Sequence, residues 1–162
     1  MIIKFYEFMS EAVVDVPKGI YVKAAPVLQS AVLLKDRFPE MTVDDPHVTL
    51  LYSKESAHNV VLPRIGKEER VKAEGYMIER FDGQEKEGYV VLRVRGAGLQ
   101  AWHDSFRNAG LVPTFPEYKP HVTLVTPAAK SDWERWIHEQ NYILASRPLP
   151  LTFYYDGYSL LD

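Results

Sequence analysis

The same five residues occur twice in this chain of 162 residues, as Pro46–Leu50 and again as Pro120–Leu124. Both copies read Pro-His-Val-Thr-Leu, and a stretch with helical spacing precedes each of them. Self-similarity of this kind predicts a duplicated half-domain. The alternative is a chance recurrence of a β-prone apolar pentapeptide. We disfavour it because a strand has little structural need for histidine.

Strand geometry predicts where the polar side chains of the two pentapeptides point. Residues two apart on a β-strand share a face, so His47 lies beside Thr49, and His121 lies beside Thr123. The valine and leucine of each copy then point the opposite way, toward a core covered by helices. If the halves are related by an approximate two-fold axis, the two polar pairs face each other across one cleft.

Two imidazoles and two hydroxyls that converge on one point suit phosphoryl transfer without a metal or cofactor. Because the ordinary pKa of histidine is about 6.5, one ring can be neutral and the other charged near neutral pH. The neutral ring can remove a proton from an attacking hydroxyl, and the charged ring can protonate the leaving oxygen. The threonine hydroxyls can donate to the phosphate oxygens. The pattern leaves open which histidine is the base.

The rest of the chain alternates between strand-like and helix-like segments. Residues 1–16 are expected to form an N-terminal extension, either a frayed helix or an extra edge strand, and residues 17–162 a single domain. The ten segments of this domain favour an α+β fold with a mostly antiparallel sheet. We expect strands at 19–23, 41–52, 71–81, 88–95, 120–125 and 149–161, helices at 25–38, 99–109 and 131–140, and a loop at 57–69.

Composition excludes several classes of function. The chain has no cysteine, which rules out disulfides, thiolate metal sites and a cysteine nucleophile. With 19 Lys and Arg against 22 Asp and Glu, the net charge of −3 gives no general reason to bind duplex DNA or an anionic membrane. No apolar run approaches the roughly 20 residues of a membrane span. We therefore expect a soluble, cytoplasmic protein, whose oligomeric state the sequence leaves open.

The two His-x-Thr motifs, in a duplicated α+β chain of this size, resemble the 2H phosphoesterase superfamily from about residue 17 onward. The resemblance implies a bilobal fold, with antiparallel sheets around a central groove and helices on the outer faces. It also implies metal-free cleavage of nucleotide phosphodiesters, with His47, Thr49, His121 and Thr123 as the catalytic residues. The segments Pro46–Lys54 and Tyr118–Leu124 are most similar to phage anti-CBASS nucleases, which degrade the cyclic di- and trinucleotide signals of bacterial defence. In a phage, such an enzyme acts in the host cytoplasm.

Alternation along the neighbouring strands predicts the walls of the groove. If Ile20 and Val22 face the core, Tyr21 and Lys23 face the groove, and the same reasoning applies to strands 88–95 and 149–161. Tyr76, on the strand at 71–81, is a further candidate. Tyrosines there could stack on bases, and the cations could meet phosphate. The alternative is that the tyrosines only complete a half-buried sheet face. The predicted substrate-binding residues are Tyr21, Lys23, Tyr76, Arg93 and Tyr154.

Other functions remain open at this point. The same motifs occur in RNA 2′,3′-cyclic phosphodiesterases and in 2′-5′ oligonucleotide phosphodiesterases, whose substrates include RNA ends. A non-catalytic sponge for cyclic nucleotides is a further alternative, as is an RNA end-binding or ligase-like module. Asp44 and Asp45 beside His47 could suggest a metal, but a zinc site usually needs three or four convergent ligands and would leave the threonines without a role. We therefore predict no metal site.

Overall fold

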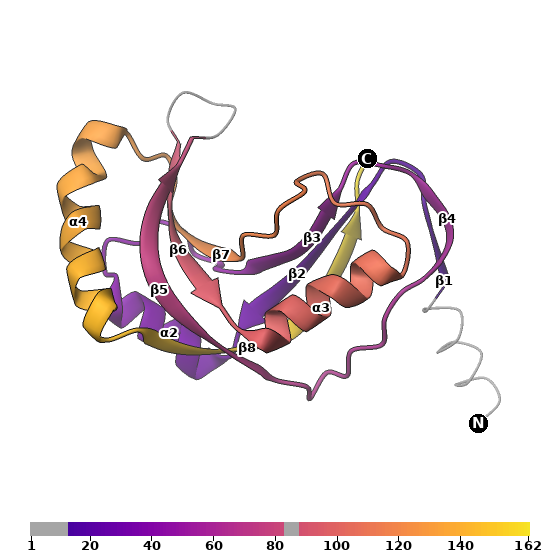
Figure 1. Cartoon of the computed structure of the whole chain (residues 1–162), viewed down its shortest axis with the longest axis horizontal. Coiled ribbons are helices and arrows are strands. Elements are labelled where there is room, and N and C mark those ends of the chain that lie inside the picture. The colour runs from indigo at the N-terminus through magenta and orange to yellow at the C-terminus, as the bar shows by residue number, and fades with distance from the viewer. Residues whose placement is uncertain (1–12, 83–87) are drawn as a thin grey trace.

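The computed structural model describes residues 13–82 and 88–162, which form eight strands and three helices. Labels follow Figure 1. The amphipathic segment 1–12 and the tip of the hairpin at 83–87 lie outside the described residues. The strands are β1 (Val13–Val16), β2 (Ile20–Pro26), β3 (Val48–Ser53), β4 (Ala57–Val61), β5 (Val71–Phe81), β6 (Tyr89–Arg95), β7 (His121–Val125) and β8 (Leu149–Leu160), and the helices are α2 (Leu28–Arg37), α3 (Ala97–Asn108) and α4 (Lys130–Ser146).

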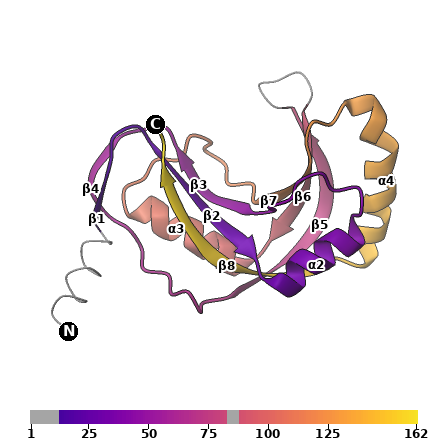
Figure 2. The same cartoon turned by 180° about the vertical axis from the view of Figure 1, so that it is seen from behind.

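Six strands close into one hydrogen-bonded ring in the order β2-β3-β7-β6-β5-β8, and every pairing is antiparallel. The expected α+β class with antiparallel strands is therefore confirmed. The ring has an internal symmetry: exchanging β2 with β6, β3 with β7, and β8 with β5 leaves every strand with equivalent neighbours. Figures 1 and 2 show the strands curving around a concave side, with α2 and α4 outside the curve.

Alternation of small and branched apolar residues builds the core on one face of the strands. In β6, Val90, Leu92 and Val94 are buried, and in β8 Leu151 and Phe153 are buried. The amphipathic helix α3 adds Leu99, Trp102 and Phe106 to the same core, and it contacts both β3 and β5. The parity predicted for these strands is correct, so the opposite face is left for polar and aromatic side chains.

Three expectations for the first half of the chain are wrong. The strand expected at 41–52 is shorter, because β3 begins at Val48 and residues 41–47 are not part of a strand. Segment 57–61 is a strand instead of part of a loop, since β4 pairs with β1 at the end of the N-terminal extension. The pairing buries Val16 of β1 and Val60 of β4. The helix expected at 25–38 begins at Leu28 because β2 continues to Pro26, where it pairs with Phe153 of β8.

The third helix also differs from the prediction. The helix expected at 131–140 begins at Lys130, its N-cap is Ala129, and no side chain caps it. It continues to Ser146 instead of ending at Gln140. Packing explains the extra length, because Leu144 is buried and Asn141 exchanges hydrogen bonds of 2.6 and 2.9 Å with the backbone of Ile78 in β5.

Candidate active site

The two pentapeptides meet where β3 joins β7. Val48 and Val122, the central residues of the two copies, are the one registered pair between these strands, and both are fully buried. In an antiparallel pair, the flanking residues lie opposite one another on the other face, which places Thr123 opposite His47 and His121 opposite Thr49. The two histidines are thus diagonal neighbours, for which Cβ atoms are about 7–8 Å apart. The structure brings all four predicted catalytic side chains together.

His47 is held at both ring nitrogens. Its Nδ1–H donates to the carbonyl of Asp45 at 3.1 Å, and its Nε2 lies 2.5 Å from the hydroxyl of Tyr21. The same hydroxyl lies 3.0 Å from Oγ1 of Thr49. Burial raises the pKa of Tyr21, so its phenol stays protonated at neutral pH. Tyr21 therefore lies in the site, as alternation along β2 predicted.

His121 has a different environment. Its Nδ1–H donates to the carbonyl of Lys119 at 2.8 Å, and its ring packs edge-on against Phe81 with centroids 5.0 Å apart. Burial lowers the pKa of His121, and the positive charge of Arg93 lowers it further. This histidine is therefore held in its neutral form, with the lone pair on Nε2 because Nδ1 carries the proton.

The two strands that carry the motifs share an irregularity. In β3, Leu50 is an extra residue between the partners of Val22 and Lys23, and in β7, Leu124 is an extra residue between the partners of Val90 and Val91. These two β-bulges fall at the same position of the repeated pentapeptide. Because of the bulges, Tyr21 in β2 and Tyr89 in β6 occupy equivalent positions beside the two motif strands. The ring centroid of Tyr89 lies 6.4 Å from that of His121.

The loops before the two motifs are tied to each other's strands. Thr42, in the loop before the first motif, accepts a hydrogen bond at Oγ1 from the backbone N–H of Thr126, at 3.1 Å. Thr114, in the loop before the second motif, donates its N–H to the carbonyl of Tyr52 at 2.8 Å and accepts from the N–H of Lys54 at 3.0 Å. Each motif is thus held in place by the loop that leads to the other.

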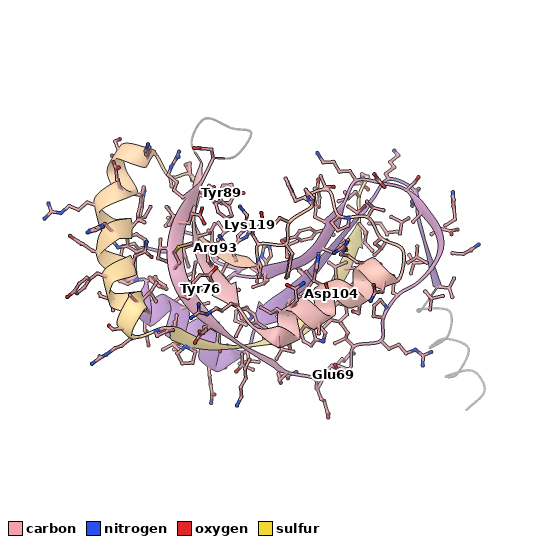
Figure 3. The ribbon with its side chains drawn as sticks, in the orientation of Figure 1. Glu69, Tyr76, Tyr89, Arg93, Asp104 and Lys119 are labelled. Carbon is pink, nitrogen blue, oxygen red and sulfur yellow. The ribbon has the colours of Figure 1, made fainter. Side chains whose placement is uncertain are left out.

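The remaining predicted substrate-binding residues differ in how they are connected to the motifs. Arg93 is the strand neighbour of His121 and forms an ion pair of 2.9 Å with Glu79. Lys23 is the strand neighbour of Thr49 and pairs with Asp156 at 3.4 Å. Tyr76 lies under the guanidinium of Arg95, 4.6 Å from the ring centroid. Figure 3 shows Tyr89, Arg93 and Tyr76 along the wall formed by β5 and β6.

Tyr154 lies on β8, which is separated from β3 by β2. Its ring lies 5.5 Å from the guanidinium of Arg70, just before β5, and its strand partner in β2 is Ala25. The hydrogen bonds and ring contacts of the two histidines are made by other residues. The structure therefore brings Tyr21, Lys23 and Arg93 to the motifs, places Tyr76 next to Arg93, and leaves Tyr154 beside Arg70.

An aromatic pocket of about 390 Å³ opens next to the motifs and was not predicted. Thr49 and His121 line its inner end, and the loop at 112–120 lines its outer side. Its aromatic lining consists of Tyr52, Phe81, Tyr89, Phe115 and Tyr118. Alternation could have identified Tyr89, which shares the parity of Arg93 on β6. The aromatic residues of the loop have no periodicity, so the sequence carried no signal that they converge.

No group of three or more His, Asp or Glu side chains that could hold a metal ion occurs within residues 13–82 and 88–162. Asp45 contacts His47 through its backbone carbonyl. The expected absence of a metal from the reaction therefore remains a prediction for experiment.

Comparison with known proteins identifies the family. The family model of the anti-CBASS protein Acb1 matches residues 18–146, which include both pentapeptides and most of the described ring. The chain belongs to the Acb1 family. Its role is thus that of an anti-CBASS protein, which evades host defence, and the resemblance noted for the two motifs is confirmed at this level. No curated protein matches the chain. None of the helices in the described parts of this Acb1-family protein is long and apolar enough to cross a membrane.

Proposed function

We propose that this protein is a metal-independent phosphodiesterase that hydrolyses cyclic di- or trinucleotide signals by general acid–base catalysis from His47 and His121. The observation that carries the proposal is the pairing of Val48 with Val122, because it puts two imidazoles and two threonine hydroxyls on one face, with a diagonal spacing that a phosphate group can bridge. The family role supplies the substrate class, since an anti-CBASS protein acts on cyclic nucleotide signalling.

In the first step, a ribose 2′-hydroxyl attacks the phosphorus of its own 3′ phosphate. His121 is the better candidate for the base, because burial and Arg93 favour its neutral form, and its Nε2 accepts the proton of the hydroxyl. The new bond joins O2′ to phosphorus, and the bond from phosphorus to O5′ breaks. His47, in its protonated form, gives a proton from Nε2 to O5′. The product is a 2′,3′-cyclic phosphate on an opened strand.

In the second step, the roles reverse. The histidine that has lost its proton accepts one from a water molecule, whose oxygen attacks the cyclic phosphate. The bond from phosphorus to O2′ breaks, and the other histidine returns its proton to O2′. Both rings end in their starting protonation states, so the cycle needs no further reactant. Thr49 and Thr123 donate to the non-bridging oxygens, where negative charge develops.

The internal symmetry of the site supports a 2H phosphoesterase with two duplicated halves. The bulges at Leu50 and Leu124 fall at the same place in each motif, and the loops before the motifs hold one another's strands. A catalyst that exchanges acid and base between two steps benefits from such an arrangement, because each histidine needs the same access to the phosphorus.

The aromatic pocket supports a nucleotide as substrate. It adjoins Thr49 and His121, so a phosphate between the motifs would direct an attached nucleoside toward Tyr52, Phe81 and Tyr89. Stacking of a base on an aromatic side chain contributes about 1–3 kcal/mol and tolerates different bases. Among the residues predicted for substrate binding, Arg93 and Lys23 are the cations nearest to the motifs in strand register.

A panel of nucleotides tests the proposal. Cyclic GMP–AMP and 2′,3′-cyclic AMP are incubated with the protein in excess EDTA, and the products are separated by ion exchange. Linear products with a terminal phosphate are expected. Turnover that disappears with EDTA would exclude the metal-free mechanism. Cleavage of 2′,3′-cyclic AMP alone would favour an RNA cyclic phosphodiesterase, and tight binding without any product would favour a cyclic-nucleotide sponge.

A further inference from the structure

The bulge in β3 leaves two consecutive carbonyls that side chains satisfy. The carbonyl of Thr49 accepts a hydrogen bond from the hydroxyl of Tyr118 at 2.9 Å, and the carbonyl of Leu50 accepts one from Nδ1–H of His103 at 2.6 Å. At the matching bulge in β7, the carbonyl of Leu124 accepts from the backbone instead, at 3.0 Å from the N–H of Thr42. The two halves of the site are therefore held by different chemistry.

The two side chains that hold β3 also stack on each other. The rings of His103 and Tyr118 are parallel, with centroids 3.9 Å apart. His103 comes from α3 and is 4 % exposed, whereas Tyr118 comes from the loop that leads to the second motif. Burial lowers the pKa of His103, which keeps the ring neutral with a single proton on the donating Nδ1.

The stack also shapes the aromatic pocket. Both rings belong to its lining, together with Thr49 and Tyr52 of β3. The loop at 112–120 is attached to β3 at two places, through Tyr118 to Thr49 and through Thr114 to Tyr52. At Thr49 the side chain of Tyr118 makes the attachment, and at Leu50 the ring of His103 lies between the strand and α3. At Leu124, which corresponds to Leu50, the backbone N–H of Thr42 bonds directly to the strand instead.

We propose that the His103–Tyr118 stack is a positioning unit that fixes the backbone of Thr49 and sets the width of the pocket for a nucleotide base. The proposal rests on the proposed function and extends it to two residues outside the motifs. The two hydrogen bonds orient Thr49, whose hydroxyl faces the phosphate, and the stacked rings set the space available to the base. Loss of one of the hydrogen bonds should therefore lower kcat, and loss of the ring stack should raise KM.

Three variants separate these roles. Tyr118→Phe keeps the stack and removes the hydrogen bond to Thr49. His103→Phe keeps an aromatic ring at the position and removes the donor to Leu50. His103→Asn keeps a donor near the position of Nδ1 and removes the ring. Tyr142→Phe is the matched control, since Tyr142 is 83 % exposed on α4. Thermal melting shows which variants are folded, and Tyr118→Phe carries the test should a His103 variant fail to fold.

Two measurements are made on each variant. Steady-state kinetics on cyclic GMP–AMP should give a roughly tenfold to hundredfold loss of kcat for Tyr118→Phe and His103→Phe, with KM little changed, because misplacement of about 1 Å has effects of this size. His103→Asn should instead raise KM about fivefold or more, as expected when a base loses part of its stacking. The control should leave both constants unchanged.

The second measurement does not depend on turnover. In NMR spectra of protein labelled at threonine methyl groups, Tyr118→Phe should shift the signal of Thr49 and leave that of Thr123 in place. Equal shifts of both signals, or an unshifted Thr49 signal, would overturn the positioning role. A wild-type protein that cleaves no nucleotide would refute the proposed function, whereas the comparison of Thr49 with Thr123 would still decide whether the stack positions β3.

Discussion

Replacing His121 by asparagine tests the acid–base mechanism with little disturbance of the fold. The amide of asparagine can take the place of Nδ1–H and keep the hydrogen bond to Lys119, but it has no counterpart of Nε2. A general base contributes about 10²–10⁴-fold to the rate, which corresponds to about 2.7–5.4 kcal/mol of transition-state stabilisation. The ring of His121 is only half-buried, so we expect stability to change by about 1 kcal/mol or less. Activity should therefore fall far more than stability.

The assay measures initial rates of product formation from cyclic GMP–AMP between pH 5 and 9, together with thermal melting of the variant. The wild-type profile should be bell-shaped, and its acidic limb should lie below pH 6.5 because burial lowers the pKa of His121. The residual activity of His121→Asn should lose that limb. A folded variant that keeps more than a tenth of the wild-type rate, or that keeps the acidic limb, would refute the assignment of His121 as the base.

Three further predictions concern the surroundings of the two histidines. Arg93→Gln should move the acidic limb of the profile to higher pH, since it removes a cation that lowers the pKa of His121 and leaves the carboxylate of Glu79 nearby; an unmoved limb would contradict the electrostatic role. Tyr21→Phe should lower kcat/KM about fivefold, the equivalent of about 1 kcal/mol for one hydrogen bond. Tyr89→Phe keeps the ring contact with His121 and should have a smaller effect in the same rate assay. The free energy of unfolding, measured with urea, should decrease as pH falls from 7 to 5. The pKa values of His121 and His103 are lower in the folded state, so the unfolded state binds more protons in this range; constant stability would contradict the burial of both rings.

Much of the site could be predicted because it obeys strand alternation. The position of a polar residue within β3 or β7 fixes the face on which it lies, so the repeated pentapeptide was enough to place His47 beside Thr49 and His121 beside Thr123. The same rule placed Tyr21 and Arg93 beside the motifs. Alternation gives the face of a strand but not the contacts of a side chain, and Tyr154 of β8 lies against Arg70, so its role in substrate binding remains a prediction.

The parts that the sequence did not predict depend on contacts between distant segments. β4 begins the mostly polar segment 57–69, and its strand conformation comes from pairing with β1. The aromatic pocket is formed by a loop whose two prolines, Pro113 and Pro116, indicate only that regular structure is absent there. The sequence around His103 in α3 gives no signal of a partner outside the helix. The hydrogen bond of His103 to Leu50 joins two elements that are far apart in the sequence.

Two identical motifs give no basis for distinguishing an acid from a base, so the asymmetry has to come from residues outside them. A strand neighbour supplies part of it, because the cation Arg93 of β6 pairs in register with His121 of β7. The first histidine has a phenol at Nε2, and the second has the ring of Phe81 and a neighbouring cation. Two equal rings that share one proton would leave much of the protein in unproductive protonation states. Burial and Arg93 lower the pKa of His121 and favour its neutral form, which is the form that the proposed general base needs.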